Sequence, residues 1–165
     1  MNTISIRLAT RDDLSAINAI YNHYVVGSTC TYQTEPSTDV ERAAWFDAHG
    51  PQHPVTVAVR LGEIVGWASL SKFHPRAAYS KTVENSVYVR HDALGCGIGK
   101  ALLADTIERA KVNGHHTIIA LISADQTASV KLHEKHGFVL GPCLREVGYK
   151  FDRWLDVVYM QRMLV

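Results

Sequence analysis

Apolar residues recur along the chain at the spacing of helix faces. Leu14, Ile17 and Tyr21 lie three and four positions apart, so they would line one side of a helix. Gly114 and Gly137 follow two such stretches directly, where glycine commonly ends a helix in the left-handed conformation. The expected helices are residues 12–26, 39–48, 98–113 and 126–136.

Shorter stretches are apolar throughout or alternate between apolar and polar side chains, as strands do. In residues 82–89, the alternation places Glu84 on the opposite face of a sheet from Asn85. Strands and helices mix along the chain, which predicts an α+β domain with a strand–loop–helix unit at its centre. The expected strands are residues 4–8, 55–59, 64–70, 82–89, 117–122, 138–146 and 154–163.

The composition fits one soluble domain over residues 1–165. Hydrophobic residues make up 47% and charged residues 20% of the chain, and the formal net charge is +1. So small a net charge gives no general attraction to nucleic acid or to a membrane surface. No apolar run approaches the ~20 residues of a membrane helix, and the first residues lack the apolar core of a secretory signal. We therefore expect a cytoplasmic protein that recognises its partner locally.

The cysteines give no sign of a disulfide framework or of a metal site. Cys30, Cys96 and Cys143 are odd in number and lack paired metal-ligand spacing. We expect reduced thiols and no bound metal.

A glycine-rich segment joins the strand at 82–89 to the helix at 98–113. Backbone N–H groups and the helix dipole at such a junction can hold a phosphate. A Walker loop would need glycine at position 94 and serine or threonine at 101, and a dinucleotide fingerprint would need glycine at 100. What remains is a Gly-x-Gly-x-Gly turn suited to the pyrophosphate of coenzyme A, or simply a tight connection. The segment consists of Leu94, Gly95, Cys96, Gly97, Ile98, Gly99 and Lys100.

Several motifs together resemble a known family. Residues 84–100, followed by SVKLHEKHGF at 129–138, resemble the Gcn5-related N-acetyltransferase (GNAT) superfamily. More narrowly, further segments are similar to the phosphinothricin and methionine sulfoximine acetyltransferase group. These segments are TYQTEP (31–36), VENSVYV (83–89), LHEKHGF (132–138) and LREVGYKFDRWLD (144–156).

The resemblance implies the GNAT fold, a single domain with a central, mostly antiparallel twisted sheet flanked by about four helices. It also implies acetyl-CoA as cosubstrate and a small amino-acid-like acceptor. A homodimer is implied as well, in which residues 145–154 of one subunit approach the active site of the other.

Two loop residues depart from the family pattern. Leu94 stands where the superfamily motif has arginine or glutamine, and Cys96 stands where the group usually has a basic residue. Losing one charge-assisted hydrogen bond would weaken coenzyme binding by about one or two orders of magnitude, unless Lys100 or Arg90 compensates.

Acetyl transfer to an amine needs a base, a polarised thioester carbonyl and a proton for the departing thiolate. The resemblance assigns the base to Glu84 and implicates His133 in catalysis. Without the motif, Glu84 would be read as a strand carboxylate that faces solvent or pairs with Lys81, and His133 as a solvated helix histidine.

The coenzyme contacts implied by the resemblance come from a strand and a helix. The strand backbone that would pair with the pantetheine arm belongs to Val87, Tyr88 and Val89. On the helix, Gln126, Ser129 and His133 recur at i, i+3 and i+7, which places them on one face.

The loop at residues 72–79 mixes cations with aromatic rings, which suits a small anionic substrate. Arg76 is the preferred anion clamp, and Tyr79 lies in the same loop. Tyr32 and Glu35, in the TYQTEP segment, are expected to line the same pocket, with Glu35 able to hold an α-ammonium group. Alternatively, all four are ordinary residues of surface loops without a role in binding.

We therefore expect an acetyl-CoA-dependent N-acetyltransferase for an α-amino acid or an analogue such as phosphinothricin or methionine sulfoximine. An enzyme of the same fold for a polyamine, an aminoglycoside or a protein N-terminus is one alternative, and a coenzyme-binding sensor without turnover is another. The same residues would be found in an enzyme that detoxifies an antibiotic-like amino acid and in one that carries out housekeeping acetylation.

Overall fold

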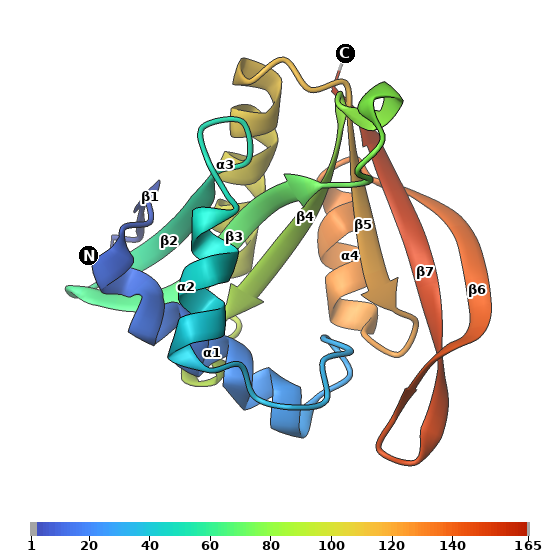
Figure 1. Cartoon of the computed structure of the whole chain (residues 1–165), viewed down its shortest axis with the longest axis horizontal. Helices are drawn as coiled ribbons and strands as arrows, with labels where there is room; N and C mark the ends of the chain where they lie inside the picture. The colour runs from blue at the N-terminus through green and yellow to red at the C-terminus, as the bar shows by residue number, and fades with distance from the viewer. Residues whose placement is uncertain (1–2, 165) are drawn as a thin grey trace.

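The computed structural model describes residues 3–164, whose strands form one seven-stranded sheet (Figure 1). The strand order is β1-β2-β3-β4-β5-β7-β6, and only the β4–β5 pair is parallel. Residues 1, 2 and 165 of the expected domain lie outside the described range. The strands are β1 (Ser5–Leu8), β2 (Val55–Arg60), β3 (Glu63–Lys72), β4 (Thr82–Val89), β5 (Thr117–Ser123), β6 (Val139–Lys150) and β7 (Arg153–Met163).

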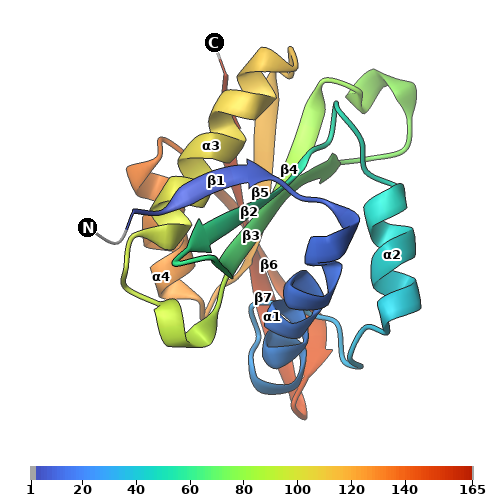
Figure 2. The same ribbon diagram turned by 90° about the vertical axis from the view of Figure 1, so that its left-hand side faces the viewer.

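Helices cover both faces of this sheet. Figure 2 shows α1 and α2 on one side of the strands and α3 and α4 on the other. The described residues contain four α-helices, so the expected mixed, mostly antiparallel sheet with about four helices is confirmed. The helices are α1 (Leu14–Gly27), α2 (Asp39–Asp47), α3 (Ile98–Val112) and α4 (Thr127–Lys135).

The first helix begins later than the predicted stretch 12–26. A short 3-10 turn at Arg11–Asp13 precedes α1. The Asp13 carboxylate accepts a hydrogen bond of 2.7 Å from the Thr10 backbone N–H and pairs with Arg7. This local capping holds the turn apart from the regular helix.

The sixth strand is longer than the predicted stretch 138–146. At Glu146, φ is +56° and the pairing register with β7 shifts, but pairing resumes at Gly148. Three residues of β6 (145–147) face one residue of β7 here, and the two extra residues form a bulge, which bends a strand without ending it. The sequence pattern does not reveal that a non-glycine residue adopts a left-handed φ angle. The predicted strand therefore ended at residue 146, where the observed strand bends.

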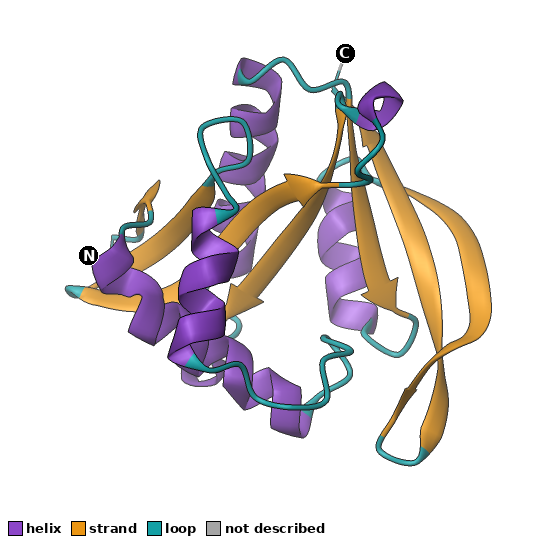
Figure 3. Ribbon diagram, viewed as in Figure 1, coloured by secondary structure: helices purple, strands orange, loops and turns teal. Residues whose placement is uncertain are grey.

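The central strands β4 and β5 separate part of the way along the sheet. They pair only at Thr82, Val83 and Glu84 of β4. Beyond Glu84, β4 keeps its pairing with β3 but has no pairing with β5. Figure 3 shows the two strands meeting near one end of the sheet and separating towards the other. This gap lies next to the end of β4 that leads into the glycine-rich segment.

Helix α3 crosses the sheet closely at Gly66 of β3. A Cβ atom at this position would lie 2.9 Å from the Tyr88 carbonyl oxygen and 3.0 Å from Leu102 Cδ1. Gly66→Ala should therefore lower the free energy of unfolding by about 1–3 kcal/mol, measured by urea denaturation. Gly27→Ala is the control, because a Cβ at Gly27 meets nothing within 4 Å. Equal stability of the two variants would contradict the close packing of α3 on the sheet.

Candidate active site

The glycine-rich segment is an open turn at the start of α3. Gly95 and Gly97 have φ angles of +76° and +79°, and a Cβ at either would meet nothing within 4 Å. The first N–H groups of α3, which begins at Ile98, have no acceptor within the helix. The first turn also carries no acidic residue. The backbone and the helix dipole can therefore receive an anionic group such as a pyrophosphate.

Few charged side chains beside this turn are available to bind an anion. Leu94 is 60% exposed, and Cys96 is exposed beside it. Arg90 forms ion pairs with Glu63 and Asp92, whereas the exposed Lys100 forms none with any described residue. Lys100 is therefore the cation that can replace the contacts missing at positions 94 and 96.

The second half of β4 has one edge without a partner strand. Val87, Tyr88 and Val89 pair with β3 across one edge. No residue of β5 pairs with them across the other edge. On β4, the Val89 carbonyl accepts a hydrogen bond from Tyr24 Oη. The other backbone N–H and C=O groups on the open edge need partners, so this edge fits an extended ligand that carries amide groups.

Glu84 is the last residue of β4 that pairs with β5, directly before the gap. Its side chain is half-buried and forms no hydrogen bond or ion pair with any described residue, including Lys81. Burial raises the pKa of Glu84 above its ordinary value of 4.5. A carboxylate that is desolvated and unpaired is a stronger base than an exposed one.

His133 lies inside the protein, between α4 and β4. It is 4% exposed, and its Nδ1 lies 2.8 Å from the Ser129 carbonyl oxygen. Its Nε2 lies 3.0 Å from Asn85 Nδ2. A neutral ring with its proton on Nδ1 satisfies both contacts, because Nδ1 donates to Ser129 and Nε2 accepts from Asn85. Burial lowers the pKa of His133 accordingly.

The two predicted catalytic side chains do not meet. Asn85, the partner of His133, follows Glu84 on β4, and successive side chains of a strand point to opposite faces. Glu84 therefore faces α1 and α2, whereas His133 lies on the side of α3 and α4.

Gln126 and Ser129 lie at the start of α4, as the helical spacing predicted. Gln126 is the N-cap residue, and its Nε2 donates a hydrogen bond of 2.8 Å to Thr29 Oγ1. Ser129 is half-buried and presents its carbonyl to His133.

The loop after α1 is held in place by distant parts of the chain. The buried Lys150 ammonium of β6 donates hydrogen bonds to the carbonyls of Ser28 and Thr31, at 2.7 and 2.8 Å. Tyr32 Oη donates to Ser123 Oγ at 2.9 Å, at the end of β5. The loop is therefore fixed against β5 and β6.

The predicted pocket residues fall at opposite ends of the sheet. Tyr32 lies at the end of β5, and Glu35, on the same loop, is exposed without a side-chain contact among the described residues. Arg76 and Tyr79 are exposed in the loop before β4, which runs parallel to β5, so they lie at the start of β5. The length of β5 separates the two groups by roughly 20 Å.

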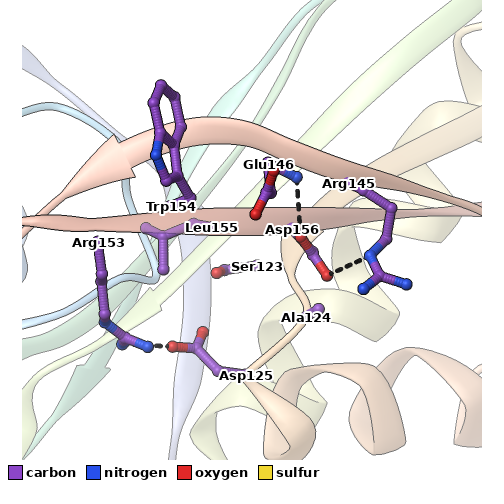
Figure 4. A pocket seen from close by; sticks show the side chains of 9 residues that line it. All are labelled: Ser123, Ala124, Asp125, Arg145, Glu146, Arg153, Trp154, Leu155 and Asp156. Carbon is purple, nitrogen blue, oxygen red and sulfur yellow. Dashed lines mark hydrogen bonds and ion pairs between the residues drawn. The ribbon is translucent and has the colours of Figure 1, made fainter.

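A pocket of about 290 Å³ opens beside the end of β5 (Figure 4). Its two arginines are already paired, Arg153 with Asp125 at 2.8 Å and Arg145 with Asp156 at 3.2 Å. Neither arginine offers an uncompensated charge to a ligand. The lining residues are Ser123, Ala124, Asp125, Arg145, Glu146, Arg153, Trp154, Leu155 and Asp156.

Sequence reasoning missed Asn85 and Arg42. Arg42 is 4% exposed and packs against the aromatic rings of Tyr21 and Trp45. One signal was present: Trp45 and Phe46 follow Arg42 at i+3 and i+4, which places it on the apolar side of its helix.

Within residues 3–164, no group of three or more histidine, cysteine, aspartate or glutamate side chains is arranged to hold a metal ion. None of the helices in this range has the length and hydropathy of a membrane-spanning segment.

Comparison with known proteins connects this geometry to one family. The sequence model of the acetyltransferase (GNAT) domain family matches residues 6–159. The chain is 43% identical to an L-methionine sulfoximine/L-methionine sulfone acetyltransferase of Pseudomonas paraeruginosa, over 95% of this chain and 92% of the relative. It is 40% identical to a phosphinothricin N-acetyltransferase of Alcaligenes faecalis, over 97% and 82% of the two chains.

The fold is also similar to solved structures. A GNAT superfamily phosphinothricin acetyltransferase from Sinorhizobium meliloti, solved in complex with acetyl-CoA, superposes with a TM-score of 0.94 at 37% identity. The match covers 98% of this chain and 88% of that one.

His133→Gln should reduce the loss of stability that accompanies acidification. The pKa of folded His133 lies below 6.5, so the unfolded chain binds this proton more readily. The free energy of unfolding therefore falls as the pH drops through 6.5, and the variant should show a shallower fall in urea titrations. A wild-type slope in His133→Gln would contradict the enclosed neutral ring.

Proposed function

The chain belongs to the GNAT acetyltransferase family, and on this premise we propose that it acetylates the α-amino group of a small amino acid or amino-acid analogue, using acetyl-CoA. Phosphinothricin, methionine sulfoximine and methionine sulfone, the acceptors named for its relatives, define this class. The observation that carries the proposal is the separation of β4 from β5 directly after Glu84. It places an unpaired, half-buried carboxylate at the mouth of the gap.

The residues around the gap fit the coenzyme. The open turn at Gly95 and Gly97, with the N-terminus of α3, would hold the pyrophosphate. The free edge of β4 at residues 87–89 would pair with the pantetheine amides. Gln126 and Ser129 at the start of α4 border the same gap. The bound coenzyme supplies an activated acetyl thioester.

Glu84 is the proposed general base. An amine attacks a thioester only after its ammonium group has lost a proton. Burial raises the pKa of Glu84, so this carboxylate binds that proton more readily than an exposed glutamate would. A β4 amide at the gap polarises the thioester carbonyl. C–N bond formation would be accompanied by C–S bond cleavage, and the proton that the nitrogen loses on becoming an amide would balance the proton taken up by the departing thiolate.

His133 remains a predicted catalytic residue. Its ring nitrogens bind Ser129 and Asn85, so donating a proton to the thiolate would require Nε2 to give up the Asn85 contact. In the arrangement described, His133 instead fixes α4 against β4.

We also propose a homodimer formed through the β6–β7 hairpin. Large apolar side chains on this hairpin are exposed, which is the usual mark of an association surface. A cytoplasmic location is proposed with it, since the cysteines are unpaired. The exposed side chains include Leu144 (41%), Val147 (56%), Tyr149 (54%), Phe151 (51%) and Trp154 (61%).

The proposal is tested by thiol release from acetyl-CoA with phosphinothricin, methionine sulfoximine, methionine sulfone, ordinary amino acids, spermidine and an aminoglycoside as acceptors. Preferential turnover of the amino-acid analogues is expected. Turnover of spermidine or the aminoglycoside alone would place the acceptor in another class, and coenzyme binding without turnover of any acceptor would favour a sensor.

Glu84→Gln should lower kcat about 100-fold or more and leave the dissociation constant of acetyl-CoA unchanged, because only the proton acceptor is lost. Its unfolding free energy at neutral pH should equal or exceed that of the wild type. Burial disfavours the ionised carboxylate, which lowers the unfolding free energy of the wild type at neutral pH. The difference in unfolding free energy between the variant and the wild type should therefore shrink as the pH falls through the raised pKa of Glu84. Glu134→Gln, at an exposed glutamate of α4, is the control. Unchanged kcat in Glu84→Gln would remove this residue from catalysis.

Leu94→Arg should tighten acetyl-CoA binding by about tenfold, because a charge-assisted hydrogen bond to the pyrophosphate becomes available. Leu94 is 60% exposed, so the exchange removes little packing. The gain should shrink at high salt, as measured by calorimetry at two ionic strengths. Leu94→Met controls for the change of side chain. An affinity equal to that of Leu94→Met would place the pyrophosphate elsewhere.

A further inference from the structure

A serine hydroxyl lies beside the proposed base. Ser71 of β3 is directly opposite Glu84 of β4 in the antiparallel pairing of the two strands. Directly opposed side chains share one face of a sheet, and their Cβ atoms lie about 4.5–5.5 Å apart. Both side chains are half-buried, so each keeps contact with solvent. Ser71 therefore borders the place at which the amine of an acceptor would meet Glu84.

His49, in the turn after α2, contacts this hydroxyl from the α2 side of the sheet. Its Nε2 lies 3.1 Å from Ser71 Oγ, and its Nδ1 lies 2.7 Å from the carbonyl oxygen of Trp45. A carbonyl can only accept a hydrogen bond, so the ring carries a proton on Nδ1. Burial lowers the pKa of His49, which keeps the ring neutral at neutral pH. Nε2 is therefore an acceptor, and Ser71 Oγ donates to it.

The contact with His49 decides what Ser71 can bind. A serine hydroxyl has one proton and two lone pairs, and here the proton is directed to His49. Within residues 3–164, the Ser71 hydroxyl has no other hydrogen-bond partner, and the Glu84 carboxylate has none. Two acceptors thus lie side by side, and neither offers a proton to a ligand. Such a pair fits a cationic donor and disfavours an anion.

We propose that Ser71 is a second binding residue for the α-ammonium group of the acceptor, and that His49 is a positioning residue that directs the Ser71 lone pairs towards this group. The inference rests on the proposed acetylation of an amino acid and adds to Glu84 the residues that hold the amine. Ser71 touches the acceptor, whereas His49 acts only through Ser71.

The strand order fits this role. Ser71 lies on the β3 side of Glu84, whereas the gap between β4 and β5 lies on the other side. Glu84 accepts one proton of the ammonium group, and Ser71 accepts a hydrogen bond from a second N–H. The lone pair that appears on the nitrogen is then free to point to the gap, where the thioester would lie. Ser71 keeps its own proton throughout, so it orients the amine and takes no part in proton transfer.

The experiment compares L-methionine sulfone with 4-(methylsulfonyl)butanoate, which differs only in lacking the amino group. Calorimetry measures binding in the presence of coenzyme A, which carries no acetyl group and allows no turnover. The wild type should bind the amino compound about 100-fold more tightly, since Glu84 and Ser71 both contact its ammonium group. Ser71→Ala should reduce this preference about tenfold, because one charge-assisted hydrogen bond is lost.

Turnover gives a second measurement. Ser71→Ala should raise the KM of L-methionine sulfone about tenfold and leave the dissociation constant of acetyl-CoA unchanged, because the lost contact concerns the acceptor alone. Ser71→Thr keeps a hydroxyl at this position and should keep both the KM and the preference for the amino compound.

A double variant tests whether His49 acts through Ser71. His49→Phe should reduce the preference several-fold. The combination of His49→Phe with Ser71→Ala should lose no more than Ser71→Ala alone, because the hydroxyl that His49 directs is then absent. Thermal unfolding identifies the variants that fold, and His49→Leu gives the same comparison if His49→Phe does not.

Two controls match these exchanges, and both should keep the wild-type preference. Ser15→Ala removes an exposed hydroxyl from α1. His136→Phe removes a half-buried histidine whose Nδ1 lies 2.8 Å from the carbonyl oxygen of Leu132, four residues earlier, as in His49 and Trp45.

A full preference for the amino compound in Ser71→Ala would overturn the inference for both residues. Additive losses in the double variant would overturn the positioning role of His49. Failure of the proposed function looks different. In that case the wild type would keep its preference, with the same dependence on Ser71, but would release no thiol from acetyl-CoA with any amino-acid acceptor.

Discussion

The whole candidate site depends on where the parallel pairing of β4 with β5 stops. Three residue pairs hold the strands together, and the last of them includes Glu84. Beyond it, one edge of β4 has no partner strand, and the Val89 carbonyl is bound by Tyr24 Oη instead. The remaining backbone groups on this edge need another partner. The same separation sets the carboxylate beside the opening and directs the end of β4 towards the glycine turn. The open edge, the carboxylate and the glycine turn, to which the proposed function gives coenzyme and base roles, are thus brought together by one interruption of the sheet.

Much of the fold could be predicted because local patterns agreed with the final packing. The alternation in residues 82–89 gave the correct strand and the correct faces, and Gly114 and Gly137 have the left-handed φ angles expected of helix ends. The boundary of β6 was missed because Glu146 adopts a positive φ, which its residue type does not reveal. The 3-10 turn before α1 was missed because it depends on the hydrogen bonds of Asp13.

The site was only partly visible in the sequence. Motif resemblance predicts roles for Glu84, the loop glycines and His133, and these stay predictions. Which face of the sheet His133 lies on depends on the docking of α4, and no local spacing encodes that contact. Arginine is usually exposed, so residue type argued against a buried role for Arg42. Arg76 stays the predicted anion clamp. Its separation from Tyr32 becomes apparent only when β4 and β5 are placed side by side.

The anchoring of the loop after α1 has a consequence for how the chain folds. Its hydrogen bonds join residues far apart in sequence: Thr29 to Gln126 across 97 positions and Ser28 to Lys150 across 122. Contacts of such separation form late, because closing a long loop costs entropy before any contact repays it. During synthesis, the loop after α1, which includes Tyr32, therefore cannot reach its final position until β6 has emerged from the ribosome. A nascent chain would form the glycine turn before α3 first and fix the loop after α1 last.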